Sequence, residues 1–183
     1  MKLARLAAIA AAVVLSACSA GPAATGELPG PVPDGVVFRD PPATAPPAPP
    51  FELNLLDGDT LDVTAEWDAR PVVLVFFESW CTLCSDQQDG INDVVDEYRD
   101  IVLFVGVANL SEASDVEQYV SDNDITYPVG IDTSGRTFLN YAVTEPPLVA
   151  LVSKGGQVLR GWPEGTSGDD LREHIDQLAV ESR

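Results

Sequence analysis

Two cysteines separated by two residues are the side chains best suited to chemistry in this sequence. Cys81 and Cys84 follow an apolar run at 71–77 and open a stretch with helical spacing. Cysteines three positions apart at a helix start lie about one turn from each other, close enough to form a disulfide. The first sulfur would face unpaired backbone N–H groups and the positive end of the helix dipole. Both stabilise a thiolate, the species that attacks disulfides. The pair therefore predicts thiol–disulfide exchange, with Cys81 as the nucleophile and Cys84 as the resolving thiol.

The segments around the pair predict a β-α-β unit. Residues 71–77 and 101–107 are continuous runs of β-branched and aromatic side chains, typical of strands buried on both faces of a sheet. Between them, residues 91–98 carry apolar side chains at helical spacing. The other expected elements are a hairpin over 51–63, a helix over 112–123, an apolar strand at 128–131, a helix over 133–141, a hairpin over 148–161 and a last helix that starts at Ser167.

The N-terminus has the order of a secretory signal. Lys2 and Arg5 precede an apolar run over 6–15, which is too short to span a bilayer comfortably. The small residues before Cys18 resemble the lipobox of bacterial lipoproteins, in which this cysteine carries diacylglycerol. The alternative is an ordinary signal peptide with an incidental cysteine. We expect an exported lipoprotein that is anchored through Cys18 on the outer face of the cell membrane.

Composition divides the chain into three parts. Residues 1–18 form the expected signal peptide, and residues 19–50 hold ten of the fifteen prolines, a composition that favours extended polyproline structure over a packed core. Fully extended, this segment would reach on the order of 100 Å. We expect this segment to form a stalk. The apolar residues 36–38 interrupt it, and there we expect the chain to dock on the domain instead. Residues 51–183 form the single globular domain.

The charge is strongly acidic. Formal net charge is −19, and the signal holds two of the ten Lys and Arg but no Asp or Glu, which leaves eight cations, 29 acids and a net charge of −21. Such a field repels nucleic acid and anionic membrane surfaces, so we expect no nucleic-acid partner. Of three cysteines, one is assigned to the anchor, and export places the remaining pair where disulfides persist.

Residues 51–183 resemble the thioredoxin superfamily, and more closely its exported TlpA, ResA and DsbE-like branch. The resemblance rests on the apolar strand ending in Phe76 and Phe77, on Trp80 with the cysteine pair, and on the segment 141–147. It implies an α/β thioredoxin-like fold, with a central mixed β-sheet flanked by helices. An N-terminal β-hairpin and an inserted helix and strand at about 112–131 complete that fold.

The resemblance also assigns roles at the site. Pro147 would follow a cis peptide bond and shape a substrate groove with Pro146, and Trp80 would flank that groove. Glu78 stands where the family has a small residue. It is a candidate proton acceptor, or its carboxylate extends to water. The dithiol carries the electrons, so no cofactor is implied.

The partners implied are exported proteins with cysteines or disulfides, and a membrane electron donor. Within this branch, reduction of specific partners, such as the haem-site cysteines of apocytochrome c, is favoured over general oxidation.

Other functions stay open for the same fold. A peroxiredoxin-like peroxidase needs a Thr three residues before its reactive cysteine, where this chain has Glu78. A copper-binding chaperone needs cysteines one residue further apart and a distant histidine, and the single histidine, His174, lies beside the apolar stripe of the last helix. A structural zinc site needs four ligands, more than the mature chain offers. A binding module with a static disulfide is the last alternative.

Overall fold

The computed structural model describes residue 26 and residues 28–183 of the chain. The predicted signal peptide and the lipidation residue Cys18 lie outside the described residues. Among the helices in the described part, none combines the length and the apolar character needed to cross a membrane.

A seven-stranded mixed sheet forms the centre of the domain, in the order β3-β2-β6-β5-β4-β7-β8. Strands β4, β5 and β6 are parallel, and antiparallel pairs extend the sheet on both sides, with β2 and β3 beyond β6 and β7 and β8 beyond β4. Every side chain of β4 and β5 is buried, as the continuous apolar runs predict. The strands of this sheet are β2 (Glu52–Leu55), β3 (Thr60–Asp62), β4 (Val72–Phe76), β5 (Leu103–Ala108), β6 (Val129–Ile131), β7 (Leu148–Val152) and β8 (Val158–Trp162).

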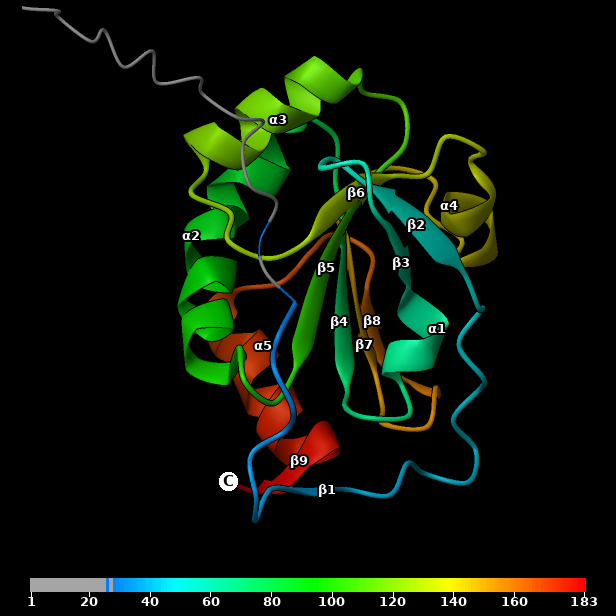
Figure 1. Ribbon diagram of the computed structural model, residues 1–183, viewed down its shortest axis with the longest axis vertical. Helices are drawn as coiled ribbons and strands as arrows, with labels where there is room; N and C mark the ends of the chain where they lie inside the picture. Colours follow the sequence, from blue (N-terminus) through cyan, green and yellow to red (C-terminus); the bar gives the residue numbers. More distant parts are fainter. Residues whose placement is uncertain (1–25, 27) are drawn as a thin grey trace, which may run out of the picture.

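Helices cover both faces of the sheet (Figure 1). Helices α2 (Thr82–Tyr98), α3 (Ala113–Asp122) and α5 (Gly168–His174) pack on one face over the larger apolar cluster. Helices α1 (Val63–Glu66) and α4 (Arg136–Asn140) cover a second cluster on the other face. This mixed sheet between two helical layers confirms the expected fold, and it places the start of α2 directly after the central strand β4.

The last helix begins where the sequence predicts and ends differently. Ser167 is its N-cap, with a side chain that accepts a hydrogen bond from the Asp170 N–H at 3.2 Å. A π-helical turn, η1 (Ile175–Ala179), follows α5, and the chain then turns into β9 (Val180–Ser182). That strand pairs antiparallel with β1 (Val37–Phe38), a partner from the other end of the chain.

The described part of the predicted stalk lies against the domain. Besides the β1–β9 pairing, the Ala48 N–H donates to the Gly156 carbonyl at 2.9 Å, and the Val158 N–H donates to the Pro46 carbonyl at 2.9 Å. Ala48 is only 5% exposed. Residues 28–50 therefore form an arm along the domain. The docking expected at 36–38 is confirmed, and residues around it that were predicted as a stalk also contact the domain. The prolines lack N–H groups, yet their carbonyls still accept hydrogen bonds. The apolar residues Val36, Phe38 and Ala48 of the arm pack against the core.

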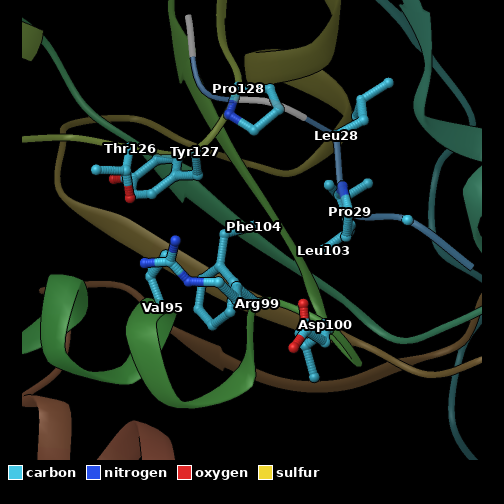
Figure 2. A pocket seen from close by; sticks show the side chains of 12 residues that line it. Leu28, Pro29, Val95, Arg99, Asp100, Leu103, Phe104, Thr126, Tyr127 and Pro128 are labelled. Atoms are coloured by element: carbon cyan, nitrogen blue, oxygen red, sulfur yellow. The ribbon is translucent and has the colours of Figure 1, made fainter. Parts of the chain in front are cut away.

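A buried arginine fixes the beginning of this arm. Arg70 is 3% exposed, and its guanidinium donates to the carbonyls of Gly30 and Asp100. Burial lowers the pKa of Arg70 below its usual value. Beside this contact, Leu28 and Pro29 line a pocket of about 320 Å³ (Figure 2).

Removing the arm should destabilise the domain. A chain that starts at residue 51 loses the β1–β9 pairing and the hydrogen bonds of Pro46 and Ala48, so we expect its free energy of unfolding to fall by about 2–4 kcal/mol against a chain that starts at 28. Urea unfolding followed by circular dichroism measures the difference. A chain that starts at residue 45 is the control, because it keeps the second set of bonds and should lose less. Equal stability of all three chains would contradict the packed arm.

Candidate active site

Cys81 ends the turn after β4 and caps helix α2. Its backbone is extended, with φ −82° and ψ 98°, and its sulfur accepts a hydrogen bond from the Cys84 N–H at 3.1 Å. The Cys81 N–H donates to the Glu78 carbonyl at 3.0 Å, which closes the turn before the helix. Cys81 and Cys84 form a disulfide with their Cα atoms 5.3 Å apart. The sulfur of Cys81 thus occupies the position where a Ser or Asp oxygen usually caps a helix.

Only the first cysteine reaches a groove. Cys81 and Cys84 are 7% and 4% exposed. Two hollows meet at Cys81, and Cys84 lines neither of them. Trp80 lines both hollows and is 60% exposed, so it stands beside the reactive sulfur. An incoming sulfur therefore meets Cys81 first, which supports its assignment as the nucleophile.

The first hollow, which we call the cis-proline groove, has a volume of about 580 Å³ and is lined by Leu83, Glu145, Pro147 and Glu164 among others. The bond between Pro146 and Pro147 is cis, which confirms the prediction. Pro147 is buried and leads directly into β7, the antiparallel neighbour of β4. Pro146 has no N–H, so only its carbonyl is able to bond to a segment lying in this groove.

The second hollow, which we call the α3 groove, has a volume of about 500 Å³ and lies on the other side of Trp80. Asp115, Tyr119 and Asp122 of α3 line it. The Tyr119 ring stacks on Phe77 with ring centroids 4.7 Å apart, which attaches α3 to the end of β4. The sequence predicted helix α3 but not this groove, because nothing in a single sequence shows which face of α3 lies beside the cysteines.

Glu78 is a buried anchor for a neighbouring loop. It is 1% exposed, and its carboxylate accepts bonds from the N–H groups of Asn109, Leu110 and Ser111 at 2.8–2.9 Å and from the Ser111 hydroxyl at 2.5 Å. The alternative in which this carboxylate extends to water is wrong, because three consecutive backbone N–H groups enclose it. The role of Glu78 as a proton acceptor stays a prediction. Both carboxylate oxygens already accept hydrogen bonds in this structure.

The anchor joins the segment before Cys81 to the segment before α3. The Ser111 hydroxyl accepts bonds from the Ser79 N–H and the Ser79 hydroxyl, both at 2.9 Å. The group of Glu78, Ser79 and Ser111, which we call the Glu78 clamp, therefore ties Ser79, which lines the α3 groove, to the loop that leads into α3. Sequence reasoning missed Ser79 and Ser111. The sequence does hold one signal for this cluster, because Glu78 directly follows a buried apolar run. A carboxylate in such a place needs nearby hydrogen-bond donors.

A second polar network ties α2 to the end of α3. The Tyr127 hydroxyl donates to Gln88 Oε1 at 3.2 Å, Gln88 Nε2 donates to Asn92 Oδ1 at 2.8 Å, and Asn92 Nδ2 donates to the Asn123 carbonyl at 2.9 Å. Burial raises the pKa of Tyr127 above its usual value. That phenol therefore stays protonated and keeps donating at neutral pH.

His174 lies away from both grooves. Its ring packs edge-on against Trp162 with centroids 5.3 Å apart, and its Nδ1 lies 2.8 Å from the Asp170 carbonyl. Within the described part of the chain, no group of three or more His, Cys, Asp or Glu side chains is arranged to hold a metal ion.

Comparisons with known proteins agree with this geometry. The sequence model of the AhpC/TSA family matches residues 45–161, which include the cysteine pair and Pro147. The thiol-disulfide oxidoreductase ResA of Bacillus thuringiensis subsp. konkukian is 24% identical over 132 residues, which cover 72% of this chain and 76% of the relative. A thioredoxin-like protein of Haemophilus influenzae is 29% identical over 114 residues, which cover 60% of this chain and 67% of the relative.

Solved structures share the fold. The structure of MTB dsbF, in its mixed oxidized and reduced forms, superposes with a TM-score of 0.64 at 27% identity and covers 69% of this chain and 93% of that chain. The pneumococcal exposed lipoprotein thioredoxin of Streptococcus pneumoniae gives a TM-score of 0.63 at 24% identity, covering 71% of this chain and all of that one. These likenesses support the thioredoxin-like architecture described above.

Replacing the clamp carboxylate should destabilise the fold. Glu78→Gln puts an amide NH₂ against backbone donors and removes the charge that they solvate, so we expect a loss of about 2–4 kcal/mol in the free energy of unfolding. Glu112→Gln, the same change on the exposed residue after the clamp, should cost less than about 1 kcal/mol. Urea unfolding measures both. A Glu78→Gln variant with unchanged stability and a slowed exchange reaction would instead favour a proton-transfer role.

Proposed function

This chain belongs to the AhpC/TSA family, and from that membership and the geometry of its cysteine pair we infer that it is a protein-disulfide oxidoreductase acting on exported proteins. One observation carries the proposal. The Cys81 sulfur sits at the helix start, accepts a backbone N–H bond and lines both grooves, whereas Cys84 lies behind it. This arrangement suits a pair in which one sulfur meets partners and the other completes the exchange.

The reaction proceeds in two exchanges. In the reduced protein the Cys81 thiolate attacks a partner disulfide, which forms a mixed disulfide and releases one partner thiolate. Cys84, deprotonated, then attacks the Cys81 sulfur, releases the second partner thiolate and closes the Cys81–Cys84 disulfide. The released thiolates take up protons, and two electrons have passed to the partner. A dithiol donor, which we expect at the membrane, restores the reduced form by the reverse sequence.

Acidic surroundings support action as a reductant. Asp86 and Asp89 on the first turns of α2 are exposed, and Glu145 and Glu164 line a groove at Cys81. Negative charge near a sulfur disfavours its thiolate, and a protein whose reduced form is less stable gives up its electrons more readily. The helix start works in the opposite direction and keeps a reactive thiolate accessible.

Export and anchoring complete the proposal. The segment before Cys18 has the order of a lipoprotein signal, and the described arm starts ten residues after it. We propose that Cys18 carries a diacylglycerol anchor and that the domain works on the outer face of the cell membrane. Its substrates would then be exported proteins with cysteines, the class of partner that the ResA resemblance implies.

Single-cysteine variants test the order of attack. A reduced Cys84→Ala chain should accumulate mixed disulfides with a disulfide-bonded protein such as insulin, because Cys81 attacks and no resolving thiol releases it. Cys81→Ala should trap none, since Cys84 lies behind the grooves. Non-reducing gels and mass spectrometry identify the adducts, and the wild-type dithiol should reduce insulin without accumulating them. Equal trapping by both variants would refute the assignment of Cys81.

Lipidation can be tested at Cys18. A diacylglycerol supplies two acyl chains, enough for stable membrane attachment, whereas one chain holds a protein only marginally. Cys18→Ala should therefore move the protein from the membrane fraction to the soluble fraction or leave an unprocessed precursor. Mass spectrometry of the mature N-terminus checks the modification. A mature chain that starts elsewhere, or an unmodified Cys18, would argue against the anchor.

A further inference from the structure

Both grooves at Cys81 carry uncompensated negative charge. Glu145 and Glu164 line the cis-proline groove, and Asp115 and Asp122 line the α3 groove. All four side chains are exposed. No Lys or Arg of the described residues lines either groove. The reactive sulfur therefore lies between two acidic rims.

The cations of the domain are held elsewhere. The described residues contain eight of them, namely Arg39, Arg70, Arg99, Arg136, Lys154, Arg160, Arg172 and Arg183. Most lie on elements at the end that carries β1, β9 and the C-terminus, opposite α3 (Figure 1).

Several of these cations are already paired. Arg172 and Arg183 both bond to Glu97, at 2.7 and 2.6 Å, and Arg70 is buried under the arm. The cations that are not paired thus lie away from the dithiol, and none of them lines a groove at Cys81. A charged rim of this kind changes association rates with partners of opposite charge.

Apolar and polar groups at the same place point to a polypeptide partner. Trp80 and Leu83 are 60% and 48% exposed beside the disulfide, and both line the cis-proline groove, so they offer an apolar surface next to an acidic rim. Tyr119 lines the α3 groove while only 6% exposed, and its buried hydroxyl has no hydrogen-bond partner among the described residues.

We propose that the dithiol selects disulfides in positively charged polypeptide segments, in which Lys or Arg residues flank the reactive cysteine on both sides and an apolar residue lies next to it. The inference rests on the proposed exchange activity and names its substrate class. The cysteine meets Cys81, the apolar residue packs on Trp80, and one cation lies over each rim. Acidic or neutral partners are the alternatives that the experiment must distinguish.

Three disulfide-linked peptides provide the test. They share one sequence with an apolar residue beside the cysteine and differ only in flanking Lys, Gln or Glu residues. The protein is the full chain with Cys18→Ala, reduced beforehand, so that Cys81 and Cys84 are its only thiols. Reduction by dithiothreitol, an uncharged thiol, normalises the intrinsic reactivity of each peptide. We expect the Lys peptide to be reduced about tenfold faster than the Gln peptide and the Glu peptide about tenfold slower, with the difference shrinking in 0.5 M salt.

Paired substitutions assign the effect to the rims. Asp115→Asn with Asp122→Asn, and Glu145→Gln with Glu164→Gln, should each lower the preference for Lys about threefold to fivefold. The control, Glu52→Gln with Asp93→Asn, removes the same charge from exposed positions outside both grooves and should leave the preference unchanged.

The outcomes separate the two proposals. Equal normalised rates for the three peptides, or a Lys preference that persists in both paired variants, would overturn the selectivity while exchange itself stands. Failure to reduce any of the peptides would overturn the proposed function together with the inference. A preference for the Glu peptide would overturn the inference alone.

Discussion

The structure depends on one constraint, which is that the N-cap side chain of helix α2 is a cysteine. A helix start leaves backbone N–H groups without partners, and an oxygen side chain usually satisfies one of them. Here the Cys81 sulfur accepts the Cys84 N–H instead. The buried strand β4 fixes where the helix begins, and the Glu78 carbonyl holds the intervening turn. The same position that completes the helix therefore prepares the sulfur to carry negative charge.

The Glu78 clamp shows how a buried charge is tolerated so close to a reactive thiol. A carboxylate without donors in the core would be strongly unfavourable. Three consecutive backbone N–H groups and the Ser111 hydroxyl solvate it, and the two loops are thereby held together. Ser79 lines the α3 groove, and the loop 109–111 leads into α3, whose residues line it as well. The clamp therefore holds together the two chain segments that carry the sides of this groove. Its charge still opposes a thiolate on Cys81, in the same direction as the acidic rims.

Much of the fold and the reactive pair could be predicted from sequence, because both rest on local patterns. The apolar runs predicted β4 and β5, and the cysteine spacing predicted the disulfide. The cis bond before Pro147 was implied by the resemblance of the segment 141–147 to the thioredoxin superfamily. The clamp could not be found in this way, and of the arm only the contact at 36–38 was predicted. Ser111 meets Glu78 across more than thirty residues, and β1 pairs with β9 from the opposite end of the chain. Such contacts depend on tertiary packing, which proline content and residue spacing do not encode.

The asymmetry between the two sulfurs explains how one pair can both capture and release a partner. In the proposed reaction, Cys81 would carry the mixed disulfide in the grooves after attack on a partner, and Cys84 lies one helical turn behind it. When Cys84 attacks the Cys81 sulfur, the partner leaves from the exposed side into solvent. A thiolate with a lower pKa leaves faster, so under the proposed selectivity a Lys or Arg beside the partner cysteine would speed release as well as binding. The acidic rims would hold such a partner before exchange without retaining its sulfur afterwards. A static disulfide would require neither the open grooves at Cys81 nor the exposed Trp80 beside it.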